Sequence, residues 1–339
     1  MWSEHVTLEY PYHFEKVLKR LSFDPLNVIQ LDEKVIYVPL FIDEEQIVVR
    51  LQGIGTVQNP QFWISSQAGD QEKVMKRMRS IFHWNEPFQN IQNHFLNTSL
   101  RPLFETYAYT PIILEFDYFA CLLRCIIHQQ INLKFATVLT DQFVKRYGTE
   151  KNGVFFFPTP ERVANISIEE LREQKFSQRK AEYIVGLAKH IVGGNVKRYG
   201  TEKNGVFFFP TPERVANISI EELREQKFSQ RKAEYIVGLA KHIVGGKLDL
   251  ARIQNETEEE VSAQLLPIRG IGAWTVQNFL MFGLGRKNMF PKADIGIQRA
   301  VQGVFQLDNK PDDAFLEKVK QECEPYCSYA ALYLWKSIE

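Results

Sequence analysis

Apolar and polar positions alternate over short runs in the first hundred residues of the chain. The clearest runs lie at residues 35–38, 47–51 and 61–64, and a period of two is typical of strands with one buried face. One stretch near residues 71–82 instead repeats its apolar positions at the spacing of a helix. Residues 1–110 are therefore expected to form an α+β N-terminal domain.

From residue 117 onward the apolar spacing becomes helical. Spacing of this kind is typical of amphipathic helices that bury one side. The expected helices cover residues 119–127, 134–147, 256–266, 273–283, 295–305, 312–323 and 329–338. Residues 111–339 are therefore expected to form an all-α domain.

An exact internal repeat lies within the helical part. Residues 144–194 recur without a single change as residues 196–246, an offset of 52. Full identity argues against a drifted structural repeat, and two copies do not make a solenoid, whose terminal repeats normally differ from its interior. We interpret the repeat as a recent or deliberately built duplication, in which one of the two helical segments is surplus.

Each copy contains clear signals for helix starts. Thr211 followed by Pro212 is typical of an N-cap with proline at the first helical position. Ser219 with Glu222 has the spacing of a capping box, and Ser229 can cap a third, longer amphipathic helix.

The surplus copy is also expected to affect how the chain associates. Closing a loop of 52 residues costs on the order of 3.5 kcal/mol, which a folded domain can tolerate. The three phenylalanines at residues 207–209, or their twins at 155–157, still need cover from other apolar surface. We therefore expect some domain swapping or self-association.

Composition narrows the class of protein. The 41 Lys and Arg balance 41 Asp and Glu, so the overall charge does not indicate a nucleic-acid binder and any such surface must be local. No apolar run approaches the roughly 20 residues that cross a bilayer, and residues 1–5 lack the order of basic and apolar residues seen in a secretion signal. We therefore expect a cytoplasmic protein with no membrane partner.

The four cysteines form two C-x3-C pairs, Cys121 with Cys125 and Cys323 with Cys327. This spacing places each pair on one face of a helix rather than in a zinc knuckle. The pairs are expected to be reduced thiols in the core.

A glycine-rich turn between two predicted helices is the first candidate site. It lies in residues 265–275 (LLPIRGIGAWT), where Gly270 and Gly272 permit positive φ and close backbone approach. Amides after such a turn can bind a phosphate from a helix N-terminus. An ordinary tight turn between helices explains this short motif equally well.

A carboxylate follows at the start of another predicted helix. Asp294 lies in residues 290–299 (FPKADIGIQR), 22 positions past Gly272. An aspartate at a helix start is usually an N-cap, so it gains meaning only together with the glycine turn.

The turn combined with Asp294 resembles the helix-hairpin-helix (HhH-GPD) DNA glycosylase superfamily, and within it the 3-methyladenine DNA glycosylase II type. The resemblance also covers residues 127–131 (IHQQI), the segment FPTPERVA and residues 328–335 (SYAALYLW). The N-terminal α+β domain is similar to the TATA-binding-protein-like domain of that type. The surplus copy is the part left outside the resemblance.

The resemblance implies a base-excision repair enzyme that flips alkylated purines out of double-stranded DNA and hydrolyses the N-glycosidic bond. Asp294 matches the catalytic aspartate. Cleavage builds oxocarbenium character on the sugar, which a carboxylate stabilises while it orients or deprotonates water. An alkylated purine such as 3-methyladenine is already cationic, so a single carboxylate suffices.

Two tryptophans match the base pocket of the superfamily. The electron-rich faces of Trp274 and Trp335 suit a cationic base, although without the resemblance each could equally be a core residue. Lyases of the superfamily carry a lysine at the position of Trp274, and this lysine forms a Schiff base. The resemblance therefore implies a monofunctional glycosylase that leaves the abasic site uncut.

Two positions depart from the best-known members. Asn278 replaces a pocket tyrosine, and Gln130 replaces the leucine that fills the gap left by the flipped base. Gln130 could still fill that gap or be a buried amide bonded to backbone, and the sequence leaves both readings open.

The hairpin is expected to contact the DNA backbone through Gly270, Ile271 and Gly272. Thr275 adds a phosphate contact or is only a helix cap.

The resemblance further implies a monovalent cation held by the main-chain carbonyls of Leu266, Ile268 and Ile271. The four-cysteine cluster of the iron-sulfur branch is absent from the sequence. No required cofactor and no iron-sulfur cluster are therefore expected.

Two other functions remain open at this point. One is a helix-hairpin-helix protein that binds DNA without chemistry, and the other is a glycosylase for uracil or oxidised purines. Asp294 argues against the first, because a pure binder gains nothing from a carboxylate that faces the phosphates.

Overall fold

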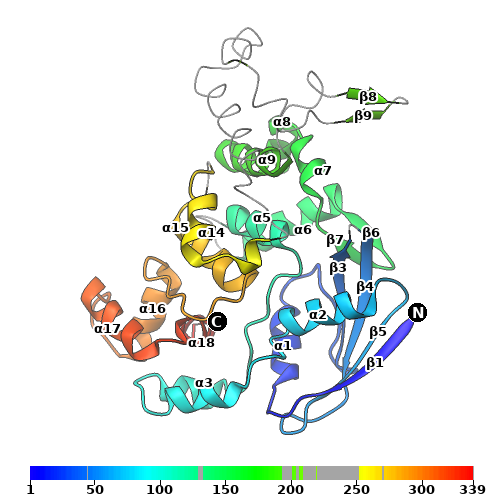
Figure 1. The fold of residues 1–339 in the computed structure, drawn as a ribbon. Coiled ribbons are helices and arrows are strands. Elements are labelled where there is room, and N and C mark those ends of the chain that lie inside the picture. Colours follow the sequence, from blue (N-terminus) through cyan, green and yellow to red (C-terminus); the bar gives the residue numbers. More distant parts are fainter. Residues whose placement is uncertain are drawn as a thin grey trace. The chain divides into compact units, whose positions relative to one another are not determined.

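A computed structural model gives the fold of the chain (Figure 1). The structure describes residues 1–43, 45–128, 133–192, 201–203, 206–208, 219, 252–268 and 271–338. These form two compact units, one made of Met1–Phe157 with Gln277–Glu339 and the other of Pro158–Val276. The first unit is built from two separate stretches of chain, and the second unit from one.

A five-stranded antiparallel sheet with strand order β1-β5-β4-β3-β2 occupies the N-terminal part of the first unit. Its strands are β1 (Trp2–Thr7), β2 (Val28–Gln30), β3 (Val35–Ile42), β4 (Glu45–Gly53) and β5 (Gln61–Ser66), and the adjoining helices are α1 (Phe14–Leu21) and α2 (Gln71–Ile81). The α+β prediction for the N-terminal part is confirmed. Its TATA-binding-protein-like character and the boundary after residue 110 stay predictions.

One face of the sheet forms a hydrophobic core with α1 and α2. On β3, Ile36, Val38 and Leu40 are at most 1% exposed, whereas Tyr37 and Pro39 between them are less buried. This alternation is the period of two that the sequence shows, because successive side chains of a strand point to opposite faces. Each fully buried aliphatic side chain contributes about 1.5–3 kcal/mol.

Helices make up most of the remaining described chain. They were predicted from residue 117 onward, whereas the two helices between residues 88 and 106 were not predicted. The first unit contains α3 (Phe88–Phe95), α4 (Arg101–Thr106), α5 (Tyr118–His128), α6 (Leu133–Tyr147), α16 (Ile295–Val304), α17 (Asp313–Cys323) and α18 (Cys327–Lys336). The second unit contains α7 (Pro160–Ala164), α8 (Ile168–Glu173), α9 (Gln178–Val192), a short 3-10 turn (Ile253–Asn255) and α14 (Glu258–Leu265), and α15 spans Ala273–Asn278. A π-helical turn (Phe279–Gly283) replaces the last turns of the single helix expected over residues 273–283.

Helix α18 is the most buried helix of the site region, with every residue from Cys327 to Leu334 buried. Its polar side chains each find a partner on another segment. The Tyr329 hydroxyl lies 3.0 Å from His83 Nδ1, and the Tyr333 hydroxyl donates to the carbonyl of Thr110 at 2.9 Å. These bonds satisfy groups whose burial would otherwise cost free energy.

The helix starts expected within the repeat are observed in the first copy. Thr159 caps α7, Ser167 caps α8, and Ser177 accepts the amide of Lys180 in the first turn of α9. The identical signals in the second copy, apart from the exposed Ser219, lie outside the described residues.

Two short β-hairpins correct the expectation that the second part of the chain is all-α. They are β6 (Thr149–Lys151) with β7 (Val154–Phe156), and β8 (Thr201–Lys203) with β9 (Val206–Phe208). In the first hairpin Asn152 and Gly153 both have positive φ, at 55° and 76°. Asn-Gly is the preferred sequence of a two-residue hairpin turn, so the sequence carried a signal that the helical reading missed.

The first hairpin packs on strand β3 within the first unit. The Phe41 and Phe156 rings meet edge to face with centroids 5.4 Å apart, and Phe156 is 1% exposed. Lys145 and Arg124 lie over the rings of Phe155 and Phe157. The phenylalanine cluster of the first copy is therefore packed against other side chains, as the sequence analysis expected.

All four cysteines are buried and free, as predicted. Cys121 and Cys125 share one face of α5, but Cys323 ends α17 and Cys327 begins α18. The prediction that the second pair lies on one helix is therefore wrong. Pro325 between them cannot continue a helix, because it lacks an amide donor and its ring clashes with the preceding turn.

Among the described helices, none combines the length and the apolar content needed to cross a bilayer.

His83 should make stability depend on pH. Burial, assisted by the charge of Lys287, lowers the pKa of His83 from 6.5 to about 4. The unfolded chain then binds a proton below pH 6.5 that the folded chain does not, so stability falls by up to about 3 kcal/mol as the pH drops to 4. His83→Asn tolerates the positive φ at this position and should remove this component. Urea denaturation at pH 7.5 and pH 4.5 measures it, and the same pH dependence in both proteins would contradict the prediction.

Candidate active site

Asp294 is the N-cap residue of helix α16. Its Oδ1 accepts the backbone amide of Ile297 at 3.0 Å and the indole Nε1–H of Trp335 at 2.9 Å. Two N–H donors on one oxygen fix the orientation of the carboxylate. The structure therefore brings together two of the predicted site residues, one from the start of α16 and one from the end of α18.

Gly296 makes this contact possible. A Cβ at this position would lie 2.9 Å from Asp294 Oδ1, 3.0 Å from Trp335 Cδ1 and 3.1 Å from Trp335 Nε1. Any side chain would therefore displace the indole or the carboxylate. Sequence reasoning did not select Gly296, although a glycine two positions after a helix-starting aspartate was a visible signal.

An aromatic neighbour lies beside Trp335. The rings of Phe282 and Trp335 have centroids 5.9 Å apart and an interplanar angle of 32°. Phe282 belongs to the π-helical turn, and such turns often occur at functional sites. Gly283 allows the turn to close, because a Cβ there would lie 2.8 Å from the ring of Phe279. Sequence reasoning also missed Phe282, since the turn looked like an ordinary helix end.

The segment that leads to Asp294 is held by α18. The Ser328 hydroxyl donates to the carbonyl of Arg286 at 2.6 Å and accepts the amide of Met289 at 2.9 Å. The amide of Asp294 donates to the carbonyl of Pro291 at 2.9 Å. The same helix thus positions the backbone before Asp294 and the indole that contacts its side chain.

Lys292 is a basic residue two positions before Asp294 in the sequence. Its ammonium group donates to Glu317 at 2.8 Å and to Asp313 at 3.2 Å, and these hydrogen bonds raise the pKa of Lys292. A protonated amine is a poor nucleophile. Lys292 is therefore unsuited to form a Schiff base with a sugar.

Asn278 ends α15 and belongs to the first unit, where it is 8% exposed. The predicted hairpin residues and the pocket residue Trp274 belong to the second unit. There Trp274 is half-buried and Thr275 is 1% exposed. Gln130 and Gly270 lie outside the described residues.

The backbone conformation of Gly272 is not one that requires a glycine. Its φ is not in the positive region, unlike that of Gly285. Gly272 is exposed, and a Cβ added there would meet nothing within 4 Å. Because Gly272 has no side chain, a ligand can approach its backbone closely. Close approach is therefore the role left for this glycine.

Two of the three carbonyls expected to bind a cation, those of Leu266 and Ile268, lie in surroundings that are compatible with a metal ligand. Leu266 caps the C-terminus of α14, where carbonyls lack helical partners and carry the negative end of the helix dipole. The carbonyl of Ile268 accepts the amide of Ile271 at 3.0 Å. A carbonyl oxygen has two lone pairs, so this bond is compatible with a metal ligand.

Comparison with known proteins decides the family. The model of the HhH-GPD superfamily of base excision DNA repair proteins matches residues 123–208 and 195–325. The chain belongs to the HhH-GPD superfamily. Each of the two matched stretches contains one complete copy of the repeat, because either copy satisfies the superfamily pattern.

Relatives of the chain carry names from this superfamily. The Bacillus subtilis (strain 168) protein named "Putative DNA-3-methyladenine glycosylase YfjP" is 38% identical over 340 residues and covers all of both chains. A DNA-3-methyladenine glycosylase of the same organism is 27% identical over 220 residues, which are 65% of this chain and 57% of that protein. The first of these relatives matches the chain along its whole length.

Solved structures share the fold. A 3-methyladenine DNA-glycosylase from Archaeoglobus fulgidus superposes with a TM-score of 0.71 at 21% identity, covering 99% of this chain and 97% of that chain. The Schizosaccharomyces pombe 3-methyladenine DNA glycosylase Mag1, in complex with abasic DNA, gives 0.50 at 23% identity, covering 73% and 96%. The Archaeoglobus fulgidus structure thus shares its fold with nearly the whole chain.

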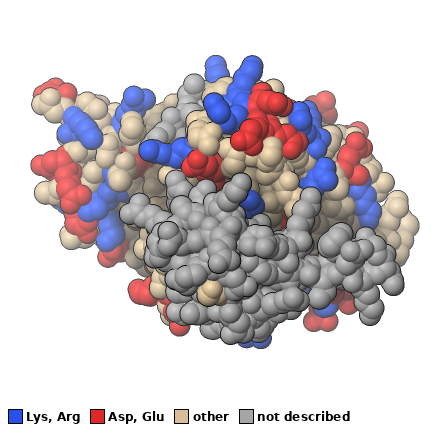
Figure 2. Space-filling view, turned by 90° about the horizontal axis from the view of Figure 1, so that it is seen from above, with Lys and Arg blue, Asp and Glu red and all other residues tan. Residues whose placement is uncertain are grey.

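Charge is mixed over the described part of the face of this HhH-GPD protein that Figure 2 shows. Lys and Arg are interspersed with Asp and Glu on the described part of the face in Figure 2, and neither sign dominates it. This agrees with the equal numbers of basic and acidic residues. Attraction to DNA must therefore come from local groups.

Gly296 can be tested against a matched position on the same helix. Gly296→Ala should destabilise the protein by about 1–3 kcal/mol, because the new methyl overpacks against Asp294 and Trp335. Gly303→Ala, where a Cβ meets nothing within 4 Å, should stabilise it by about 0.5–1 kcal/mol. Urea denaturation of both variants measures the difference. The same effect at both positions would rule out the proposed clash.

Proposed function

We propose that this protein is a DNA glycosylase of the 3-methyladenine DNA glycosylase II type. It flips an alkylated purine out of double-stranded DNA and hydrolyses its N-glycosidic bond. The single observation that supports this best is the oriented carboxylate of Asp294, fixed by Ile297 and Trp335 in a chain that belongs to the HhH-GPD superfamily. The names of the relatives support the choice of alkylated purines as substrate.

In this mechanism Asp294 stabilises the positive charge that develops on the sugar as the base leaves. The same carboxylate orients or deprotonates the attacking water. Because Oδ1 is held by two N–H donors, the group needs little reorganisation when charge develops. A cationic base leaves readily, so no acid is required on the base side.

Trp274, Trp335 and Asn278 form the base pocket in this proposal. The indole N–H of Trp335 donates to Asp294, so this residue both offers an aromatic face to the base and positions the carboxylate. Asn278 replaces an aromatic residue of better-known members, which makes the pocket more polar and adds a group that can donate to or accept from the base.

The hairpin binds the DNA backbone in this proposal. Amides around Gly270, Ile271 and Gly272 contact a phosphate, with Thr275 beside them and Gln130 entering the gap left by the base. The carbonyls of Leu266, Ile268 and Ile271 hold a monovalent cation that adds positive charge near the phosphate. No other cofactor takes part.

We also propose that the surplus copy of the repeat promotes self-association. The phenylalanine cluster of the first copy is covered on strand β3. A cluster of identical sequence in another molecule can compete for the same packing site on β3. Such competition is the condition for domain swapping.

Asp294→Asn tests the catalytic role. Asparagine caps a helix as well as aspartate does but lacks the charge, so release of methylated base from alkylated DNA should fall at least about 100-fold. Asp312→Asn is the matched control, because Asp312 caps α17 and its carboxylate accepts the amide of Phe315 at 2.7 Å. The control should release base at the wild-type rate. Unchanged release by Asp294→Asn would refute the mechanism.

The absence of lyase activity is tested on a duplex with one natural abasic site. The protein should bind this duplex without cutting the strand, and borohydride should trap no covalent complex, because Trp274 stands where lyases carry lysine. Strand cleavage or a trapped complex would overturn the monofunctional assignment. Lys292→Gln would then show whether Lys292 is the amine responsible.

A further inference from the structure

Phe23 lies on the loop after helix α1 and is 67% exposed. A single exposed apolar residue is common on protein surfaces and needs no explanation by itself. Phe23 differs in its position relative to Asp294, in the rigidity of its loop and in the charge of its neighbours. Each of these points to the same ligand.

A continuous series of contacts joins the end of α1 to the candidate active site. The guanidinium carbon of Arg20 lies 5.8 Å from the centre of the Phe282 ring, and the Phe282 ring in turn lies beside Trp335 at an interplanar angle of 32°. The amide of Phe23 donates to the carbonyl of Arg20 at 3.3 Å. Phe23 thus comes directly after the last turn of α1, three positions past the residue that contacts Phe282.

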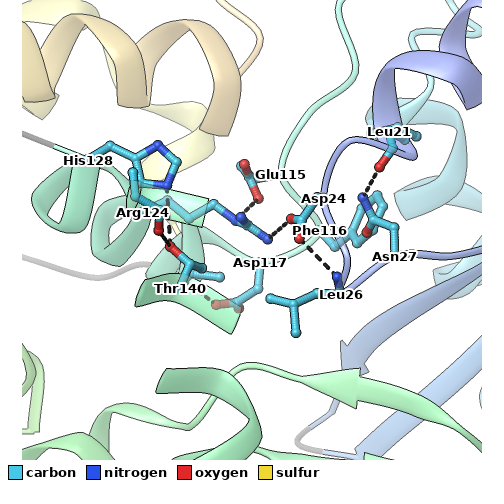
Figure 3. Close-up of polar contacts among 12 residues, drawn as sticks. Leu21, Asp24, Leu26, Asn27, Glu115, Phe116, Asp117, Arg124, His128 and Thr140 are labelled. Carbon is cyan, nitrogen blue, oxygen red and sulfur yellow. Dashed lines mark hydrogen bonds and ion pairs between the residues drawn. The ribbon is translucent and has the colours of Figure 1, made fainter. Parts of the chain in front are cut away.

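The loop that carries Phe23 is fixed by buried polar contacts (Figure 3). Asp24 pairs with Arg124 at 2.6 Å and accepts the amide of Leu26 at 3.0 Å. Arg124 also pairs with Glu115 at 3.1 Å, and its side chain is only 17% exposed. Figure 3 shows Arg124 reaching from α5 to a point between Glu115 and Asp24.

Two further bonds, both made by Asn27, close the loop around Phe23. The side-chain amide of Asn27 donates to the carbonyl of Leu21 at 2.9 Å, and the amide of Asn27 donates to the carbonyl of Asp24 at 3.1 Å. The backbone on both sides of Phe23 is therefore held in one conformation. A group held in this way loses little conformational entropy when it binds a ligand.

The charges beside Phe23 suit an anionic ligand. Lys19 and Arg20 lie in the last turn of α1, and Lys19 is exposed. The acidic neighbour Asp24 is already paired with Arg124. An exposed aromatic ring beside two basic groups is typical of surfaces that stack on a nucleobase and contact the adjacent phosphates.

We propose that Phe23 stacks on a nucleobase left unpaired beside the extruded nucleotide, while Lys19 and Arg20 contact the phosphates of that strand. The N-terminal α+β part of the chain then contributes directly to DNA binding. This inference rests on the proposed function, because an unpaired base next to the site arises when the enzyme extrudes its target.

The experiment measures binding of the full chain to two labelled duplexes. One is fully paired, and the other carries a single tetrahydrofuran abasic-site analogue, which leaves the opposite base unpaired. Phe23→Ala should bind the abasic duplex about tenfold more weakly, since one stacking contact is lost, and the paired duplex within about twofold of wild type. Phe23→Tyr should restore tight binding to the abasic duplex.

Two further variants separate stacking from other effects. Leu31→Ala removes another apolar side chain, 50% exposed, and should leave both affinities unchanged. Lys19→Gln should weaken binding to both duplexes alike and reduce the slope of log affinity against log salt by about one.

The outcomes distinguish this inference from the proposed function. Wild-type affinity of Phe23→Ala for the abasic duplex, or an equal loss on both duplexes, would overturn stacking by Phe23, while base release that depends on Asp294 would still support the glycosylase. A selective loss with Phe23→Ala together with no base release by the wild-type protein would support stacking and overturn the proposed activity.

Discussion

The arrangement of the site depends on one requirement, that the polar groups of buried helix α18 be satisfied by hydrogen bonds. Four of its side chains reach four different segments. Ser328 binds the loop before Asp294, Tyr329 meets His83, Tyr333 binds the carbonyl of Thr110, and Trp335 donates to Asp294. Each bond avoids an unsatisfied buried group, which would cost about 1–3 kcal/mol. The helix therefore ties the N-terminal part of the chain to the proposed catalytic carboxylate.

The same requirement explains why the carboxylate has a defined orientation. An N-cap alone fixes one hydrogen bond, as Asp312 does for α17. Asp294 receives a second donor from a residue of α18 that is itself packed against Phe282. This second bond needs the open space at Gly296. The difference between a structural cap and a candidate catalytic group thus lies in tertiary contacts around the cap.

The sequence predicted elements whose signals are local. The strands of the sheet and the long amphipathic helices follow from periods of 2 and 3.6, because the apolar side of each element must be buried. The N-caps at Thr159 and Ser167 follow from side chains that bond their own helix. Asp294 was identified from its spacing to the glycine turn, although spacing alone did not show which groups would hold it. Contacts such as Trp335 with Asp294 join residues 41 positions apart, and no local pattern encodes them.

The missed features have physical reasons of the same kind. The π-helical turn at Phe279–Gly283 keeps the apolar spacing of a helix, so periodicity did not reveal it. The hairpin around Asn152 and Gly153 lay inside a stretch read as helical. The repeat sets a stricter limit, because two copies of one sequence carry identical local signals. The contact of Phe156 with Phe41 gives the hairpin of the first copy a place on the sheet, and such a choice depends on tertiary packing alone.

Helix α18 follows every other described element along the chain. During synthesis the sheet and both copies of the repeat leave the ribosome before it, since domains form in order from the N-terminal side. Until α18 has been synthesised, its hydrogen-bond partners His83, Thr110 and Asp294 are hydrated instead. The proposed catalytic group therefore takes its final arrangement only after the sheet and the repeat have been synthesised, whichever copy of the repeat the earlier steps have selected.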